Sequence, residues 1–339
     1  MNTVELTVLM TVYNGEKYIK ETINSVLNQS YQNFKFLIIN DGSTDRTQNI
    51  IEYYAEKDKR INVYSLEKNV GVGVTLQKGL SLIETKYIVK ADADDLFHKD
   101  RFKLQIEFLK ANSDISMVGS LINYFPDNER ILDSSRYKYL KHFYEIHQNN
   151  IIDKQDLKEK INWYNCFIHG SLMGRTDHIK QVGYPSFQIA EDYYLIYHMN
   201  KLGFNFAKIN KKLVNIRVSS DSTTVREHDK ILESIIEIKR KDLENFLNGN
   251  SPVYIWGAGS FGKTLLSKYE FISKRVVGFI DSNKANWDKV ISDKKVYSPS
   301  IINQKRIKVL VASSLGRFEI AKELQKMGYQ SGIDFFVVN

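Results

Sequence analysis

Short apolar segments alternate with amphipathic segments through the first 122 residues of the chain. The apolar segments are rich in β-branched and aromatic residues, which is typical of strands, at 7–13, 34–39, 61–66, 87–91 and 116–122. Between them, apolar residues recur at helical spacing, which predicts helices at 18–27, 47–55, 71–83 and 101–112. Strands that alternate with helices predict an α/β fold, with a mostly parallel sheet and helices on both faces.

The chain is less regular after residue 122. The segment 124–165 is aromatic and charged, fits neither period, and is interpreted as a lid or an insertion that faces an acceptor. A helix is predicted within 187–202, with a core stripe formed by Leu195, Ile196 and Met199. An amphipathic helix is predicted at 226–247.

A second α/β pattern follows the break Asn248-Gly-Asn-Ser-Pro252, which indicates a domain boundary. Its predicted strands are 253–256, 276–280 and 308–312, and its predicted helices are 263–269 and 318–327. We therefore expect a large domain at 1–225, a helical linker at 226–250 and a small domain at 251–339.

Composition restricts the class of protein. No signal peptide is expected, because residues 1–5 lead straight into a strand, and no apolar run is long enough to span a bilayer. One cysteine, Cys166, permits no intrachain disulfide, which fits a reducing cytosol. Residues 251–339 hold 14 Lys and Arg against 7 Asp and Glu, whereas the rest hold 34 against 33. This basic excess suits an anionic membrane surface, an acidic partner or simply solvent.

An acidic cluster ends one of the predicted strands. The apolar run before Asp92-Ala-Asp-Asp95 predicts a buried strand that delivers three carboxylates to the edge of a sheet. Carboxylates this close repel one another, and a hard divalent ion with a bound diphosphate would relieve the repulsion. Acids that cap the next helix are the alternative. Tyr13-Asn14 and Asp41 follow two other predicted strands, and ligands of parallel sheets bind at these carboxyl ends.

The ordered motifs from Leu6 to about Ser222 resemble the family 2 glycosyltransferases, which have the GT-A fold, and cover about two thirds of the chain. The matching segments are Thr11-Val-Tyr-Asn14, Asn40-Asp-Gly-Ser-Thr-Asp45, Asp92-Ala-Asp-Asp95, Ile168-His-Gly-Ser-Leu-Met-Gly-Arg175 and Glu191-Asp192. The resemblance implies that Thr11 and Tyr13 line a nucleobase pocket. It also implies that Asp41 binds the base and that Asp92 lies near the ribose.

The same resemblance implies the chemical roles. Asp94 would be the ligand of Mn²⁺ or Mg²⁺, which neutralises the leaving diphosphate, and Asp192 the general base. His169, Glu191 and Arg217 are candidates for acceptor or loop contacts. Strand-end packing for Tyr13, first-turn helix acids at 191–192 and a core histidine at 169 remain the alternatives.

Two departures from the family pattern affect the donor site. Leu76-Gln77 stands where relatives often have an Arg-Asn pair available to the diphosphate, so Lys78 and Arg175 are considered as donor-binding replacements. Ser stands after Arg217 where a His is common, and we expect the loop 219–224 to close over the donor.

The second domain carries a glycine motif, Gly257-Ala-Gly-Ser-Phe-Gly262, after a strand and before a helix, with Asp281 at the end of the next strand. This context fits a dinucleotide fingerprint, so Gly257, Gly259, Gly262 and Asp281 form a candidate second nucleotide site. The piece resembles the small Rossmann-like domains appended to some sugar-modifying enzymes. It has only one of the two halves of a full dinucleotide site, so NAD(P) is not expected, and structural or partner-docking roles are favoured.

The resulting expectation is a cytoplasmic, inverting, metal-dependent glycosyltransferase. It would move a sugar from a nucleotide donor, a UDP-sugar, to a glycan or lipid-linked acceptor in surface polysaccharide biosynthesis. No nucleic-acid partner is expected, and peripheral association with the inner face of the cell membrane stays open. The alternatives are a non-catalytic scaffold that binds sugar nucleotides and an NAD-linked oxidoreductase that modifies sugars.

Overall fold

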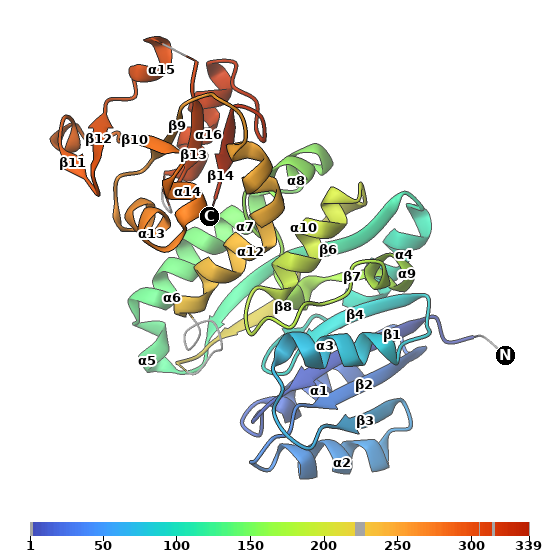
Figure 1. The fold of residues 1–339 in the computed structure, drawn as a ribbon. Coiled ribbons are helices and arrows are strands. Elements are labelled where there is room, and N and C mark those ends of the chain that lie inside the picture. The colour runs from blue at the N-terminus through green and yellow to red at the C-terminus, as the bar shows by residue number, and fades with distance from the viewer. Residues whose placement is uncertain (1–2, 221–227, 305, 314–315, 339) are drawn as a thin grey trace. The chain divides into compact units, whose positions relative to one another are not determined.

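The computed structural model describes residues 3–220, 228–304, 306–313 and 316–338. Two compact units divide the chain, Met1–Ile231 and Leu232–Asn339. Figure 1 shows that each unit surrounds a sheet of its own with helices. The expected loop at 219–224 lies mostly outside the described residues.

Within the described residues, the first unit contains one sheet of eight strands in the order β3-β2-β1-β4-β7-β6-β8-β5. The strands are β1 (Leu6–Val12), β2 (Phe34–Asn40), β3 (Ile61–Ser65), β4 (Tyr87–Asp92), β5 (Leu96–Phe97), β6 (Ile115–Pro126), β7 (Met173–Arg175) and β8 (Asn205–Val218). The first four strands are mutually parallel, while β7 and β5 run antiparallel to their neighbours. The expected α/β sheet is confirmed, and it is mixed.

Helices cover both faces of this sheet. Leu6, Val8 and Met10 of β1 share a core with Ile19 and Ile23 of α1. On the opposite face, α3 packs so closely on β1 that a Cβ on Gly79 would lie 2.5 Å from Leu9 Cδ1. The helices outside 124–165 are α1 (Ile19–Leu27), α2 (Thr47–Lys57), α3 (Val72–Ser81), α4 (Arg101–Ala111), α9 (Thr176–Lys180) and α10 (Glu191–Lys201). Burial of both faces explains why the strands read as apolar runs.

The segment 124–165, which the sequence left unassigned, is mainly helical. It contains α5 (Glu129–Leu132), α6 (Ser135–Tyr139), a π-helical turn (Leu140–Tyr144), α7 (Glu145–Asn150) and α8 (Lys154–Lys160). Glu145 is buried, and its carboxylate accepts hydrogen bonds from the ammonium groups of Lys141 and Lys212 and from the backbone N–H of Tyr124. The segment is therefore attached to β6 and β8 by a buried charged group.

The second unit has a six-stranded sheet within its described residues, in the order β11-β12-β10-β9-β13-β14. The strands are β9 (Val253–Trp256), β10 (Val276–Ile280), β11 (Val290–Ile291), β12 (Lys294–Tyr297), β13 (Lys308–Val311) and β14 (Phe335–Val337). All its pairings are parallel except that of β11 with β12. The helices are α12 (His228–Leu247), α13 (Ser260–Lys268), α14 (Glu270–Ser273), α15 (Ile301–Gln304) and α16 (Arg317–Lys326).

The helical linker expected at 226–250 is not a separate part. Ile236, Leu243 and Phe246 of α12 are buried in the core of the second unit, beside Val253 and Leu310. Most of α12 therefore belongs to that unit, because its apolar stripe completes the unit's core.

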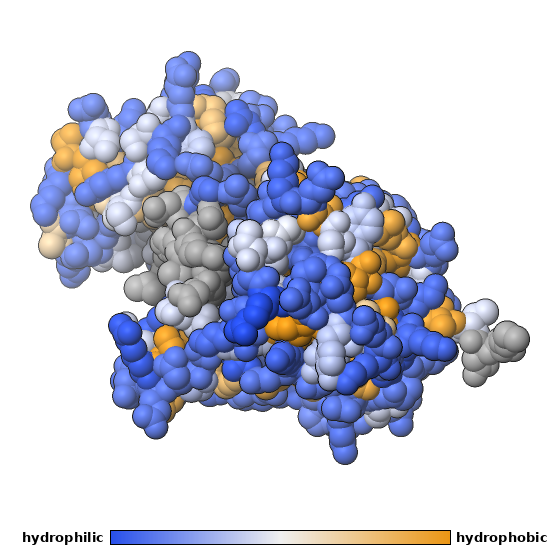
Figure 2. Space-filling model, turned by 90° about the horizontal axis from the view of Figure 1, so that it is seen from below, coloured by the Kyte–Doolittle hydropathy of each residue, from blue (hydrophilic) through white to orange (hydrophobic). Residues whose placement is uncertain are grey.

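The described residues contain no helix that is both long and apolar enough to cross a membrane. On the face seen in Figure 2, hydrophilic side chains predominate and hydrophobic ones lie in small, separate patches. Scattered apolar residues of this kind are ordinary on folded domains.

Candidate active site

The register of the first sheet brings several candidate residues to one edge. Thr11 of β1 pairs with Ile39 of β2 on one side and with Asp92 of β4 on the other. These positions are at the carboxyl ends of three adjacent parallel strands. The edge is therefore where a ligand is expected to bind in a sheet of this type.

The acids after β4 differ in their environments. Lys90 is buried, and its Nζ lies 2.7 Å from Oδ1 of Asp92. Burial opposes ionisation of Asp92, but Lys90 and His169 outweigh it and hold the pKa of this carboxyl below its usual value. Burial and the neighbouring charge of Asp92 raise the pKa of Asp94 to about 6. Burial and the neighbouring charges of Asp94 and Asp92 raise the pKa of Asp95 well above its usual value.

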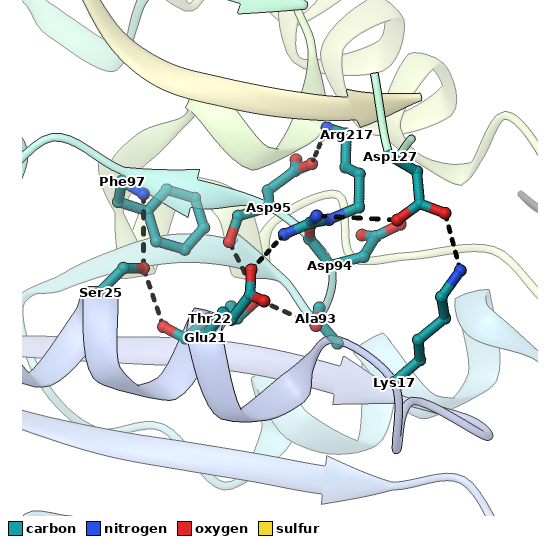
Figure 3. Close-up of polar contacts among 10 residues, drawn as sticks. All are labelled: Lys17, Glu21, Thr22, Ser25, Ala93, Asp94, Asp95, Phe97, Asp127 and Arg217. Atoms are coloured by element: carbon teal, nitrogen blue, oxygen red, sulfur yellow. Dashed lines mark hydrogen bonds and ion pairs between the residues drawn. The ribbon is translucent and has the colours of Figure 1, made fainter. Parts of the chain in front are cut away.

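Arg217 fixes the backbone of this acidic loop (Figure 3). Its backbone N–H donates to Oδ1 of Asp95 (2.9 Å), and its Nε donates to the carbonyl oxygen of Asp94 (3.0 Å). The rest of the guanidinium faces Glu21, at 2.6 Å, and Asp127, at 3.9 Å. Arg217, a candidate for acceptor or loop contacts, is thus directed at the protein's own loop.

Helix α1 supports the same loop from the other side. The hydroxyl of Thr22, which is fully buried, donates to the carbonyl oxygens of Ala93 (3.0 Å) and Asp95 (2.9 Å). The side chains of Asp92 and Asp94 are consequently presented from a rigid turn.

A second pair of acids begins helix α10. Ala190, the residue before the helix, has a φ of 66°, a backbone conformation that is uncommon for a residue with a side chain. Oε1 of Glu191 lies 3.6 Å from Nδ1 of His169, whose Nε2 lies 3.0 Å from the Tyr184 hydroxyl. Burial and Glu191 raise the pKa of Asp192 to about 6, against the effect of His169.

The acids after β4 and the pair Glu191–Asp192 meet at the turn His169–Ser171. A Cβ placed on Gly170 would lie 2.6 Å from Oδ2 of Asp92 and 3.2 Å from Oδ2 of Asp95. Gly170 therefore lies against Asp92 and Asp95 of the loop after β4, while the adjacent His169 lies close to Glu191 of α10. Acids about 100 residues apart in the sequence are brought to one place, and only glycine fits between them.

The residues fit a divalent ion only with help from a substrate. Within the described ranges, no group of three or more His, Cys, Asp or Glu side chains is arranged to hold a metal. Burial and the charge of Asp92 raise the pKa of Asp94, and a cation bound there would favour its ionised form. Mg²⁺ and similar ions are commonly held by one or two carboxylates plus substrate phosphates, which matches this arrangement.

Tyr13 directly follows β1, at the same carboxyl edge of the sheet. The loop after β1 is tied to the loop after β2, since Asn14 N–H donates to Ser43 Oγ (2.9 Å) and Thr44 N–H donates to Asn14 Oδ1 (2.8 Å). Asn14 has a φ of 51°. The Tyr13 side chain is left 41% exposed, as a ring available for stacking would be.

Asp41 was expected to bind a nucleobase, but its carboxylate is bound to backbone groups. Its two carboxylate oxygens accept the backbone N–H groups of Val70 (2.9 Å) and Gly71 (3.1 Å), and the residue is 4% exposed. Asp41 therefore holds the chain that enters α3, and direct contact with a nucleobase is not supported.

Two donor-binding candidates are placed elsewhere. The Arg175 guanidinium donates to the backbone carbonyls of Leu109, Asn112 and Ile115. Arg175 also pairs with Tyr87 at the start of β4, about 16 Å along the strand from Asp92. The ammonium of Lys78 lies 4.9 Å from the centre of the Tyr64 ring on β3, with β2 and β1 between that strand and β4. Each cation therefore already has a structural partner, and a role in donor binding stays a prediction for both.

The glycine motif of the second unit is largely explained by packing. A Cβ on Gly257 would lie 2.3 Å from the carbonyl oxygen of Ala312, and one on Gly262 would lie 2.1 Å from that of Gly257. Asp281 accepts the N–H of Ala258 (3.1 Å), so it braces this loop. Gly259 alone faces open space, with nothing within 4 Å of an added Cβ.

Sequence patterns did not single out three residues that contact the acidic loop, His169 or Asp192. These are Thr22, Tyr184 and Asn165, whose Nδ2 donates to Oδ2 of Asp192 (2.8 Å). Their contacts join residues 15 to 73 positions apart, and no local spacing reports such pairs. Only Asn165, three residues before the Ile168–Arg175 motif, lay near a segment that had been singled out.

This fold and this edge of acids define a glycosyltransferase of the GT-A type. The family described as "Glycosyl transferase family 2" matches residues 7–183, and the chain belongs to that family. The family "C2185-like, N-terminal" matches residues 249–332.

Curated relatives carry the same activity in their names. An uncharacterised glycosyltransferase of Haemophilus influenzae is 29% identical over 246 residues, covering 72% of this chain and 74% of that protein. The O-antigen biosynthesis glycosyltransferase WbnJ of Escherichia coli is 28% identical over 252 residues, covering 72% and 92%.

Solved structures share the fold. S. aureus TarS 1-349, in complex with UDP-GlcNAc, matches with a TM-score of 0.55 and 21% identity, covering 70% of this chain and 66% of that one. The mannosyltransferase PcManGT of Pyrobaculum calidifontis, in complex with GDP-Man and Mn²⁺, matches with a TM-score of 0.53 and 17% identity, covering 73% and 66%.

Proposed function

We propose that this glycosyltransferase is inverting and metal-dependent, and that it moves a sugar from a UDP donor to a glycan or lipid-linked acceptor. The observation that carries the proposal is the meeting of Asp92 and Glu191–Asp192 around His169 and Gly170. The acids after β4 suit the donor diphosphate with its cation, and Glu191–Asp192 suit the acceptor hydroxyl.

The donor would bind along the carboxyl edge of β1 and β4. The Tyr13 ring would stack on the base, Thr11 would line the same pocket, and Asp92 would accept hydrogen bonds from ribose hydroxyls. Asp94 would hold Mn²⁺ or Mg²⁺ together with the diphosphate, and the ion would supply charge neutralisation to the leaving group. The TarS complex, a protein of the same fold, holds UDP-GlcNAc, which favours a UDP-sugar donor.

Asp192 would act as the general base. Its carboxylate takes the proton of the acceptor hydroxyl while that oxygen bonds to the anomeric carbon. The bond from this carbon to the diphosphate breaks, and its electron pair leaves with the nucleotide. A pKa near 6 keeps Asp192 ionised at neutral pH and makes it a stronger base than an ordinary aspartate. One base and no covalent intermediate imply inversion of configuration.

The setting we propose is polysaccharide assembly in the cytosol, at the inner face of the cell membrane. The name of WbnJ, an O-antigen biosynthesis enzyme, supports the setting, and a single cysteine that forms no disulfide, Cys166, fits a reducing compartment. For residues 251–339 we propose partner docking, with the open face of Gly259 left as the candidate for a nucleotide contact.

The test is transfer by the purified chain. A panel of nucleotide sugars is first screened by thermal shift with and without Mn²⁺, since a ligand that binds the folded state raises its Tm. The donor found is then assayed with EDTA, and the anomeric configuration of the product is read by ¹H NMR. Transfer with inversion that stops in EDTA supports the proposal. Retention of configuration, or full turnover in EDTA, refutes it.

A further inference from the structure

We propose that Asn165 is a positioning residue, which orients the Asp192 carboxylate and favours its charged form by donating a hydrogen bond to it. The inference rests on the proposed role of Asp192 as the base. It starts from one contact, in which Nδ2 of Asn165 lies 2.8 Å from Oδ2 of Asp192.

The direction of this hydrogen bond follows from a second contact. The backbone N–H of Phe167 donates to Oδ1 of Asn165 at 3.1 Å, and a backbone N–H can only donate. The amide oxygen of Asn165 is thereby assigned to Phe167, so its NH₂ group must face Asp192. A donor held against a carboxylate stabilises the ionised form and opposes protonation.

The backbone of Asn165 is held in place by hydrogen bonds from buried side chains. Nε2 of Gln148 donates to the backbone carbonyl of Asn165 at 2.8 Å. Nζ of Lys208 donates to the carbonyls of Gln148 (2.7 Å) and Cys166 (2.9 Å), and both Gln148 and Lys208 are buried. These contacts hold the backbone of Asn165, and the Phe167 N–H holds its side-chain amide, so the donor is in place before any substrate binds.

The other groups around Asp192 leave this task to Asn165. Glu191, on the same helix, opposes the charge of Asp192, whereas His169 on the turn before β7 favours it. The Tyr184 hydroxyl is engaged with His169, and Oδ1 of Asp192 accepts the N–H of Tyr193 at 2.6 Å. Asn165 is thus the neutral side chain that donates to Oδ2, and it leaves the remaining lone pairs of the carboxylate for an acceptor hydroxyl.

Two substitutions separate positioning from support of the fold. Asn165→Ala removes both contacts of the amide. Asn165→Asp keeps an oxygen for the Phe167 N–H but replaces the donor with a second acid beside Asp192. Asn62→Asp, at an exposed position of the edge strand β3, is the matched control. It makes the same chemical change far from α10.

The full chain is labelled with ¹³Cγ-aspartate, and the titration of Asp192 is followed by NMR, with Asp192→Asn as the assignment control. Loss of one hydrogen bond to a charged group should move the midpoint up by about one pH unit in Asn165→Ala, and the added acid should move it further in Asn165→Asp. The same shifts should appear in the acidic limb of kcat, with a loss of about fivefold at pH 6 and donor KM unchanged. Asn62→Asp should show neither.

A midpoint that stays at the wild-type value in Asn165→Asp overturns the inference, because that variant keeps the structural contact. A wild-type chain without transferase activity would defeat the proposed function, yet the NMR titration would still decide whether Asn165 acts on Asp192. A shift by NMR with no shift in the rate profile would leave the action of Asn165 on Asp192 in place and contradict the proposed role of Asp192 as the base, since Asp192 would then not be the group that limits turnover.

Discussion

Nδ1 of His169 lies 3.6 Å from Oε1 of Glu191, and the glycine that follows His169 lies directly against Asp92. Two adjacent residues of one turn therefore join the acid that ends β4 to the acids that begin α10. The imidazole of His169 lies between the Glu191 carboxylate and the Tyr184 hydroxyl.

Gly170→Ala should disable the enzyme without unfolding it. The new Cβ would lie 2.6 Å from Oδ2 of Asp92, so Asp92 must leave its position beside Lys90. We expect kcat/KM to fall by about 100-fold or more, because a displacement of about 1 Å at a reacting centre has effects of that size. Steady-state kinetics with far-UV circular dichroism checks this. Near-normal kinetics in a folded variant would contradict the close packing at this turn.

Asp94→Asn should lose activity and gain stability. In the folded chain the pKa of Asp94 is raised to about 6, so the native state resists its ionisation. Ionisation of Asp94 lowers the free energy of unfolding. This loss is absent below the pKa that Asp94 has in the unfolded state, and it grows as the pH rises to the pKa of the folded state. The variant should therefore be more stable than wild type at pH 8, by about 1–2 kcal/mol, and nearly equal to it at pH 4.

Urea unfolding at pH 4 and pH 8 measures this difference, and Mn²⁺ titration of each protein measures the lost ion site. An Asp94→Asn chain that still needs Mn²⁺ with wild-type affinity would remove Asp94 from its proposed role.

Arg175→Ala should affect folding and leave donor binding alone. The guanidinium donates to three backbone carbonyls, and its removal deletes these hydrogen bonds, at a cost of about 2–3 kcal/mol. Urea unfolding and donor KM, measured together, separate the two roles. A tenfold rise in KM at unchanged stability would return Arg175 to the donor site.

Turnover of the wild-type enzyme should fall as the medium becomes acidic. Asp192 must be ionised to accept a proton, and its pKa is raised to about 6 by burial and Glu191. Below that pH, kcat should drop about tenfold per pH unit. A rate that stays constant from pH 7 to pH 4.5 would mean that no such carboxylate limits the reaction.

Local patterns in the sequence were enough to predict the strands that carry the site. β1, β2 and β4 read as apolar runs because both faces of the sheet are covered, and the polar residues that follow them fall at its carboxyl edge. Asp92 and Asp94 could therefore be assigned to this edge before any coordinates were known.

Other parts depend on contacts that no short pattern reports. β8 (Asn205–Val218) was missed because its middle is exposed and lysine-rich, and its pairing with β6 shifts register there. Asp41 was assigned to the base by the family resemblance, and Lys78 and Arg175 were considered as replacements for the Arg-Asn pair. Their true partners are backbone groups and a ring, brought close only by folding.

The most direct test compares Asp192→Asn with wild type in two measurements on the same preparations. One is UDP-sugar binding by calorimetry with Mn²⁺, and the other is the rate of sugar transfer. Asp192→Asn should bind the donor with wild-type affinity and transfer at least 100-fold more slowly, because only the base is lost. Transfer at the wild-type rate would show that the acids around His169 and Gly170 do not form the catalytic centre.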